Sequence, residues 1–344
     1  MELYNSKVES ISKRVHEAIC DIIRELSTMI VLERDSNFLG DAFEYLIHMF
    51  LYNSQTIQRQ FYTPSEVSDM MVRISMIGKE NEKNVFVYDG SLGSGILLFS
   101  IFKHIGNTHN LCYYGQEYND STVYDIARIN MILHGIPMNK VNLHMTTSLN
   151  ENWPSSVENS LKFDVVLMNP PFSMKWTPEK QFLQDPRFST YECLAPKSNA
   201  DFAFILHGLY YLKETGTMAI IVPYGVLTRG GVEHKIRKKL LDKGAIYAVI
   251  SMPDRIFYNT ATATTILVLK KNTKLKDVLF IDASREFKKV KNRNVLTENC
   301  IQKIVDTYTK RRCFDKYAYL ASYEEIKEMT IILIYIIILI CFQI

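Results

Sequence analysis

The residues Asn169-Pro170-Pro171-Phe172 could bind the amino group of an aromatic base. They directly follow an apolar run, 163–168, that reads as a buried strand. The Asn169 side-chain oxygen and the Pro170 carbonyl are both acceptors, and they could hold the two hydrogens of one NH2 group. Such an amine is a poor nucleophile because its lone pair is delocalised, and two acceptors would favour a more tetrahedral nitrogen. Phe172 would offer a face for stacking the base, whereas the plain alternative is a turn whose prolines merely end the strand.

A glycine-rich turn and an acidic residue form a second candidate site. The turn Asp89-Gly90-Ser91-Leu92-Gly93-Ser94-Gly95 directly follows a predicted strand at 85–88. Its glycines would let a ligand approach the backbone closely, although a tight strand–helix corner would also need them. Glu117 stands about 22 residues later, where a carboxylate at a strand end can accept both hydroxyls of a ribose. The turn lacks the G-x-G-x-x-G spacing and the lysine of a P-loop, which favours a nucleoside without polyphosphate.

A third stretch, Phe61-Tyr62-Thr63-Pro64, lies upstream of the first predicted strand. Thr63 precedes a proline and is therefore expected to be extended, while Pro64 suits the first position of a helix predicted over 66–77. By itself this stretch would be an ordinary helix start with two packed aromatic rings. Beside the other two sites it becomes a candidate lid over the ligand.

The elements that must position these residues follow from hydrophobic periodicity. Helices are predicted at 8–33, 41–51, 96–103, 123–133, 200–212 and 232–241. Strands are predicted at 85–88, 111–114, 141–144, 163–168, 218–222, 246–251, 264–269 and 278–281. This alternation indicates an α/β fold with a parallel, doubly wound, Rossmann-like sheet and a helical N-terminal extension.

Composition bounds the remaining possibilities. The chain has 344 residues, of which 47% are hydrophobic and 12% aromatic, so a full core is expected and disorder is excluded as the main state. The net charge of +3 gives no indication of nucleic-acid binding by bulk charge. Two local basic runs, 235–239 and 288–293, are interpreted as solvated faces rather than as phosphate contacts.

Cysteine spacing and the N-terminus indicate a cytoplasmic protein. The six cysteines are scattered without a C-x-x-C pair, which predicts neither a metal site nor a redox motif. The first residues lack a basic start followed by an apolar run, so no signal peptide is expected.

Together the three stretches resemble an S-adenosylmethionine-dependent DNA adenine-N6 methyltransferase, and the chain is similar to the modification subunit of type I restriction-modification systems. The resemblance covers roughly residues 35–328. Its further supporting stretches are 115–117, 127–131, 133–135, 200–204, 217–223, 229–231, 257–260 and 265–271. The Asn-Pro-Pro-Phe loop is shared with protein-glutamine methyltransferases, while the later stretches are more specific to the type I subunits. A stand-alone protein or RNA methyltransferase would not need residues 200–328 in this pattern.

The resemblance implies a role for each site residue. The cofactor S-adenosylmethionine would be bound by the residues Gln60, Phe61, Tyr62, Thr63, Pro64, Ser65, Asp89, Gly93, Ser94, Gly95 and Glu117. The catalytic residues would be Asn169, Pro170, Pro171 and Phe172, acting on an adenine flipped from the duplex. The sequence departs from the family at three places: Arg59-Gln60 replaces Gly-Glu, Gly90 replaces a proline, and Thr147 replaces an aspartate near the cofactor adenine.

The resemblance also implies partners and a domain plan. The partners would be double-stranded DNA, a specificity subunit, a second modification subunit and a restriction subunit, with no membrane. The expected parts are a shortened helical segment at 1–58, the methyltransferase domain at 59–285, the start of a helical C-terminal region at 286–328 and an apolar tail at 329–344. The alternative is a truncated, catalytically weak remnant that keeps the cofactor-binding fold but no longer assembles.

The apolar tail has a sequence that no packed domain end requires. Eight of the residues 331–344 are isoleucine, and the run is shorter than the roughly 18–20 residues that span a bilayer. The resembling family continues after a stretch like 322–328 with Asn-Asp-Tyr-Asn-Leu-Asn-Ile. One coding of that peptide, read without its first nucleotide, gives the residues 329–335 of this chain. We therefore hypothesise a shifted reading frame, which sequencing of the gene would test and which would remove docking to the specificity subunit.

Overall fold

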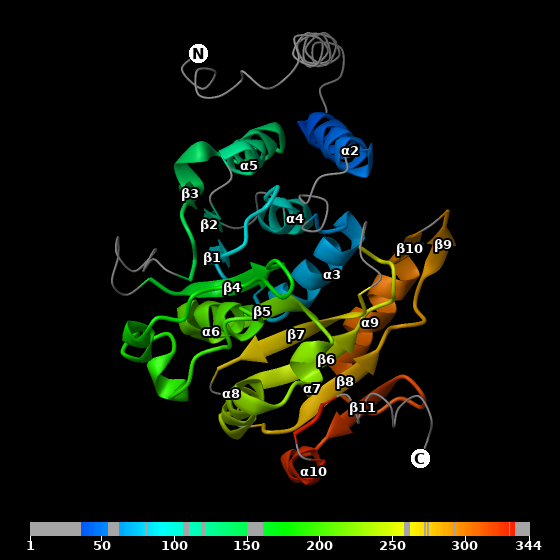
Figure 1. Ribbon diagram of the computed structural model, residues 1–344. Helices are drawn as coiled ribbons and strands as arrows, with labels where there is room; N and C mark the ends of the chain where they lie inside the picture. Colours follow the sequence, from blue (N-terminus) through cyan, green and yellow to red (C-terminus); the bar gives the residue numbers. More distant parts are fainter. Residues whose placement is uncertain are drawn as a thin grey trace.

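The alternating strands and helices build one nine-stranded sheet with helices on both faces (Figure 1). The structure is a computed structural model that describes residues 36–53, 62–79, 81–105, 110–118, 121–149, 161–257, 262–271, 273, 275–291, 293–329 and 331–333. The helix expected at 8–33, the lid residues Gln60 and Phe61, and the tail beyond residue 333 lie outside the described residues.

The strand order across the sheet is β11-β8-β6-β7-β5-β4-β1-β2-β3. The strands are β1 (Asn84–Asp89), β2 (Asn110–Glu117), β3 (Val141–Met145), β4 (Phe163–Met168), β5 (Leu212–Pro223), β6 (Ile246–Ser251), β7 (Thr264–Lys270), β8 (Val278–Asp282) and β11 (Ala318–Ala321). Each strand predicted from the sequence is present, which confirms the α/β class. The carboxyl ends of β1, β2, β4, β5, β6 and β8 share one edge of the sheet, because these strands run parallel.

The expectation of a wholly parallel sheet is corrected at two strands. β7 is antiparallel to both β5 and β6, and β11 is antiparallel to β8. Parallel neighbours need a crossover, usually a helix, and the described part of the connection from β6 to β7 contains none. The chain therefore turns back beside β6, and the sheet is mixed.

The strands are apolar on both sides because two separate cores cover the two faces of the sheet. Along β5, Met218, Ile220 and Val222 face one core, while Ala219 and Ile221 face the other. The first core also contains α6 (Asp201–Tyr211) and α8 (Gly231–Asp242). The second contains α3 (Ser65–Met76), α4 (Ile96–Ile105), α5 (Ser121–Leu133) and α9 (Glu298–Lys310). This two-sided burial explains the nearly continuous apolar runs in the sequence.

The ends of the described chain add elements that periodicity missed. The helix expected at 41–51 is α2 (Ser36–Asn53), and the helix predicted to begin at Pro64 begins one residue later, with Pro64 as its N-cap. The segment 286–328, expected to begin a helical region, contains α9, α10 (Tyr323–Glu328) and also β11, which joins the central sheet. It begins with a two-stranded hairpin of β9 (Lys288–Val290) and β10 (Arg293–Val295). A short helix, α7 (Gly225–Thr228), follows β5.

None of the described helices is both long enough and apolar enough to cross a bilayer.

Candidate functional site

The three stretches singled out in the sequence meet at the carboxyl edge of the sheet. Asp89 ends β1, Glu117 ends β2, and Asn169 directly follows β4. β1 lies between β2 and β4, so the glycine-rich turn after β1 has the other two candidates on either side. The parallel pairing of these strands is what gathers residues that are far apart in the chain.

Asn169 connects the loop Asn169–Phe172, the target loop, to both other stretches. Its side-chain Nδ2 donates to Thr63 Oγ1 at 3.0 Å, across 106 positions of sequence. Its backbone N–H donates to Ser91 Oγ at 3.0 Å. The side chain is buried, and because its nitrogen end is turned toward Thr63, its oxygen end is turned away. One residue thus fixes the relative positions of the lid, the glycine-rich turn and the loop.

The glycine-rich turn is closed by Glu117. The backbone N–H of Gly93 donates to Glu117 Oε2 at 2.9 Å, and the N–H of Leu92 donates to the Gln116 carbonyl at 2.9 Å. Gly93 and Gly95 have φ of 54° and 79°, a conformation that residues with a side chain rarely adopt. The backbone geometry, rather than a lack of space, therefore requires glycine at Gly95, where an added Cβ would meet its nearest neighbour at 3.5 Å.

Asp89 places a buried carboxylate beneath this turn. Its Oδ1 accepts from the backbone N–H of Ser91 at 2.8 Å, while its buried Oδ2 has no hydrogen-bond partner within the described part of the chain. Burial raises the pKa of Asp89 to about 7, against the lowering effect of the Ser91 hydrogen bonds, and the nearby Glu117 raises it further. A buried, unsatisfied acid oxygen of this kind would be stabilised by a cationic ligand group.

The lid segment is fastened by a residue that the sequence did not reveal. Tyr62 donates its hydroxyl to Glu44 on α2, and Asn130 on α5 donates Nδ2 to the same carboxylate at 2.5 Å. Asn130 Nδ2 also lies 3.0 Å from the Ser94 carbonyl, so the anchor reaches the glycine-rich turn. Burial raises the pKa of Glu44, and the two hydrogen bonds oppose that rise. No local pattern marks Glu44, because its partners come from other elements.

A buried polar chain supports the turn from below. Arg187 Nη1 lies 3.1 Å from His207 Nδ1, His207 Nε2 lies 2.5 Å from the Tyr88 hydroxyl, and Tyr88 donates to Gln116. Since the tyrosine proton goes to Gln116, His207 must supply Nε2–H and accept from Arg187 at Nδ1. Burial, and then the charge of Arg187, hold the pKa of His207 well below its ordinary value, so the ring stays neutral. Sequence analysis missed this hydrogen-bond network because its residues lie on separate elements.

The loop beyond Asn169 is held at its other end. Phe172 is half-buried and packs edge-on against Phe257, with ring centroids 6.0 Å apart. The backbone N–H of Ser173, at φ 52°, donates to Asp201 Oδ1 at 3.0 Å, and Asp201 pairs with Arg229. Pro170 is buried and Pro171 half-buried, which leaves the loop little freedom.

Other predicted site residues have simpler surroundings. Ser65 is exposed and Ser94 is half-buried, with a buried hydroxyl that has no hydrogen-bond partner among the described residues. Thr147, at the position of the family's aspartate, is half-buried. Across the described chain no group of His, Cys, Asp or Glu has a metal-binding arrangement.

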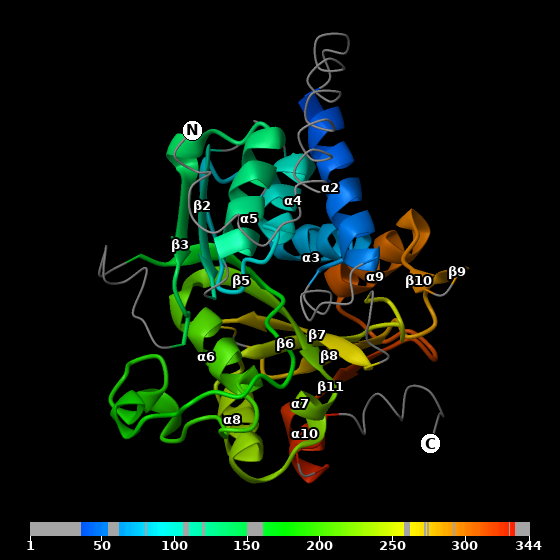
Figure 2. The same cartoon turned by 45° about the horizontal axis from the view of Figure 1, so that its top comes forward.

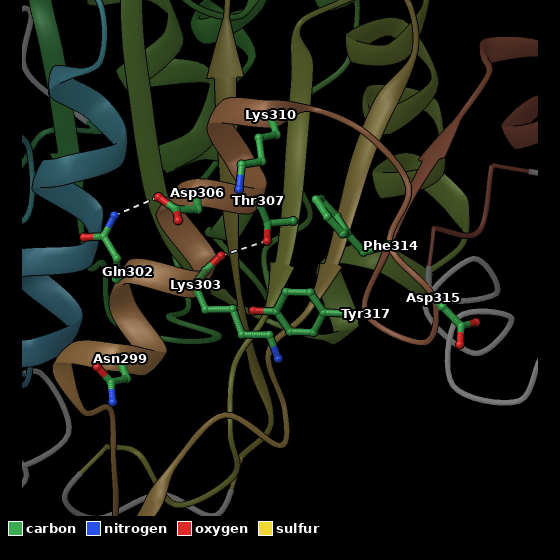
Figure 3. Close-up of a pocket in the computed structure, with 9 residues that line it drawn as sticks. All are labelled: Asn299, Gln302, Lys303, Asp306, Thr307, Lys310, Phe314, Asp315 and Tyr317. Carbon is green, nitrogen blue, oxygen red and sulfur yellow. Dashed lines mark hydrogen bonds between the residues drawn. The ribbon is translucent and has the colours of Figure 1, made fainter.

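A separate pocket of about 570 Å³ lies along α9 (Figure 3). Figure 3 shows its lining residues on α9 and on the segment that leads to β11; they are Asn299, Gln302, Lys303, Asp306, Thr307, Lys310, Phe314, Asp315 and Tyr317. None of these is a predicted site residue. Two bonds within the helix stabilise this surface, from Gln302 to Asp306 at 2.7 Å and from Thr307 to the Lys303 carbonyl at 2.7 Å.

The fold and the edge site together define a Rossmann-like α/β protein built like the S-adenosylmethionine-dependent methyltransferases. A putative class I methyltransferase of that kind from Listeria monocytogenes shares the fold, with a TM-score of 0.61 at 18% identity over 79% of each chain. The family model described as N-6 DNA Methylase matches residues 34–333, and the chain belongs to this family.

Within this family, the chain is similar to methyltransferase subunits of type I restriction-modification systems. The methylase subunit of the type I restriction enzyme MpnII from Mycoplasma pneumoniae is 39% identical over 91% of this chain. The chain spans 59% of the length of that relative. The crystal structure of a type I restriction-modification system methyltransferase subunit from Streptococcus thermophilus has a TM-score of 0.87 at 44% identity, covering 97% of this chain and 70% of the other.

Proposed function

We propose that this chain transfers a methyl group from S-adenosylmethionine to N6 of adenine in DNA, as a subunit of a type I restriction-modification complex. The observation that carries the proposal is the double attachment of Asn169, to Thr63 at 3.0 Å and to Ser91 at 3.0 Å. These bonds put a loop with amine acceptors directly beside a turn suited to a nucleoside. The similarity to type I methylase subunits supports the same function, and none of the similarities favours an inactive remnant.

The residues present fit the cofactor. Asp89 Oδ2, which has no hydrogen-bond partner among the described residues, would receive a cationic group of its methionine part, and the buried Ser94 hydroxyl would supply a further polar contact. Glu117, already held by Gly93, would accept the ribose hydroxyls. The segment Tyr62–Ser65 would cover the ligand. When bound, S-adenosylmethionine supplies a methyl group activated by the positive sulfur.

The target loop would bind and orient the base. The Asn169 oxygen, turned away from Thr63, and the Pro170 carbonyl would accept the two N6 hydrogens and expose the nitrogen lone pair. Phe172 would stack on the flipped adenine while Phe257 supports its edge. Because the methyl donor is already activated, positioning would supply most of the catalysis.

The proposed partners are double-stranded DNA, a specificity subunit that supplies sequence recognition, a second modification subunit and a restriction subunit. The location that this assembly implies is the cytoplasm.

The test is methyl transfer from isotopically labelled S-adenosylmethionine to duplex DNA, with and without a matching specificity subunit. We expect label on DNA, much more with the specificity subunit, and all of it in N6-methyladenine after digestion to nucleosides. Label on cytosine or on protein, or no transfer in the assembled complex, would contradict the proposal.

A further inference from the structure

The β9–β10 hairpin extends from the same side of the sheet as the proposed active site. It follows β8, which runs parallel to β6, so it begins at the carboxyl edge. Figures 1 and 2 both show β9 and β10 at the margin of the molecule, beside α9 and α3 and away from α8. The two short strands are antiparallel; the side chains of β9 are exposed, while those of β10 are half-buried or buried and hold the hairpin to the domain.

The hairpin and its neighbourhood carry positive charges that no acidic side chain pairs with among the described residues. The side chains of Lys288, Lys289 and Lys291 are exposed, as are those of Arg285 and Arg255 beside the base of the hairpin. No ion pair or side-chain hydrogen bond joins any of these five to another described residue. Such a group of unpaired cations suits an anionic partner.

The second basic run, 235–239 on α8, has paired lysines, although the two runs look alike in sequence. On α8, Lys238 pairs with Asp242 at 3.5 Å and Lys239 pairs with Glu192 at 2.7 Å. α8 also packs in the other core, on the face of the sheet opposite α3 and α9. The run on α8 is therefore a solvated face whose charges are partly paired, whereas the lysines of the hairpin have no acidic partner among the described residues.

The base of the hairpin is fixed relative to the target loop. Arg293 Nη2 pairs with Glu66 Oε1 on α3 at 3.1 Å, and α3 begins directly after the lid stretch. Asn294 Nδ2 donates to the Asp254 carbonyl at 2.8 Å. The same connection after β6 continues to Phe257, which packs against Phe172 of the target loop. These contacts fix the base of the hairpin to α3 and to the connection that reaches the target loop through Phe257.

We propose that the β9–β10 hairpin, together with Arg255 and Arg285, contacts the phosphate backbone of duplex DNA next to the target adenine. This inference rests on the proposed function and adds the DNA-binding element to it. A duplex presents one negative charge per about 1.7 Å of axis, so several lysines on one ribbon can each neutralise a phosphate. The contact would be independent of sequence, which leaves base recognition to a partner.

The experiment compares the full chain with two triple variants. One is Lys288→Gln with Lys289→Gln and Lys291→Gln; the control, Lys235→Gln with Lys238→Gln and Lys243→Gln, removes the same charge at α8. Binding to a fluorescent duplex is measured by anisotropy between about 50 and about 200 mM salt. Thermal melting and cofactor binding show whether each variant keeps its fold and its cofactor site.

We expect the hairpin variant to lose at least about tenfold in DNA affinity and to lower the slope of log K against log salt by about 2–3, at about 0.9 per lost phosphate contact. The control should bind DNA like the unmodified chain. Equal slopes for the hairpin variant and the unmodified chain would overturn the proposal, and so would an unmodified chain without salt-dependent DNA binding. Methyl transfer to N6 in the assembled complex is scored separately, so the hairpin can fail while the proposed function stands.

Discussion

At the scale of single residues, Asn169 has a structural role and a proposed catalytic role. It holds Thr63 through its nitrogen and, in the proposed function, the target amine through its oxygen. Because Asn169 lies between the buried strand β4 and two prolines, its side chain can adopt few other orientations. The functional and structural roles can be separated by measuring turnover, cofactor affinity and stability together.

Asn169→Ala should lower methyl transfer at least about a hundredfold, because an acceptor of the reacting amine is lost. Cofactor affinity should stay nearly unchanged, because the backbone N–H of residue 169 still donates to Ser91 and Tyr62 still holds the lid through Glu44. The free energy of unfolding should fall by about 1–3 kcal/mol, since Thr63 keeps a buried hydroxyl without its partner. Single-turnover kinetics, calorimetry and thermal melting measure the three quantities. Lost cofactor binding in a folded variant would contradict the assignment to the target amine.

Asp89 predicts how cofactor affinity depends on pH. Its pKa of about 7 means that the free site is largely protonated in mild acid, whereas a cationic ligand group prefers the carboxylate. Affinity should therefore rise as pH increases toward about 7 and level off above about 8. Calorimetric titrations at several pH values check this. Asp89→Asn should bind more weakly with a flat profile, and an equally steep profile in that variant would exclude Asp89 as the titrating group.

The same group affects the stability of the cofactor-free protein, in the opposite direction. Because the pKa is raised on folding, the folded state binds more protons than the unfolded state between about pH 4 and about pH 7. The contribution of Asp89 to stability is thus present in acid and is lost as pH rises through about 7. Asp89→Asn removes this titration, so the unfolding free energy of the variant relative to the unmodified chain should rise between about pH 4 and about pH 8. Denaturant unfolding of both chains at several pH values measures this, and a difference that does not change with pH would contradict the raised pKa.

At the scale of elements, α2 is connected to the site through Glu44. The carboxylate accepts from Tyr62 of the lid and from Asn130 on α5, so three segments depend on one half-buried acid. α2 precedes the sheet in sequence but takes part in shaping its edge site. We therefore expect substitution of Glu44 on α2 to change the affinity for the cofactor.

Glu44→Ala should weaken cofactor binding by about 1–3 kcal/mol, because Tyr62 and Asn130 lose the acceptor that they share. Glu44→Gln should retain most of the affinity, since burial already raises the pKa of this acid and a neutral acceptor can replace it. Asp41→Asn is a matched control on the same helix, because Asp41 is exposed and pairs at the surface with Lys103. Calorimetry on all three variants decides. Equal affinity of Glu44→Ala and Asp41→Asn would show that Glu44 does not position the lid.

At the scale of the whole molecule, the described start of the apolar tail packs onto the domain. Ile331 and Leu333 are buried in the core that contains α6 and α8. The Leu333 N–H donates to the Leu227 carbonyl at 3.1 Å, and the Ile331 carbonyl accepts from the buried Arg237 at 2.8 Å. The hypothesis of a shifted reading frame remains a prediction. Whatever its outcome, these residues contribute to the fold.

A chain ending at Glu328 should be less stable than one ending at Leu333, by about 2–5 kcal/mol. The loss combines two buried aliphatic side chains with a buried Arg237 that loses one acceptor. Denaturant unfolding of the two truncated chains measures the difference. Equal midpoints would mean that the packing of Ile331 and Leu333 contributes nothing.

The sequence alone determined the α/β class and nearly every strand of the sheet, and it predicted the three stretches that the fold brings together as a candidate site. This was possible because these features are local: apolar runs mark strands buried on both faces, and Asn169-Pro170-Pro171-Phe172 and the glycine-rich turn each lie within a few residues. Only the tertiary structure decided the reversed direction of β7 and the partnership of Glu44 with Tyr62 and Asn130. It also separated two basic runs that the sequence made equivalent. Direction, partnership and the neutralisation of charge depend on residues from distant parts of the chain, and one sequence contains no local signal for contacts of that kind.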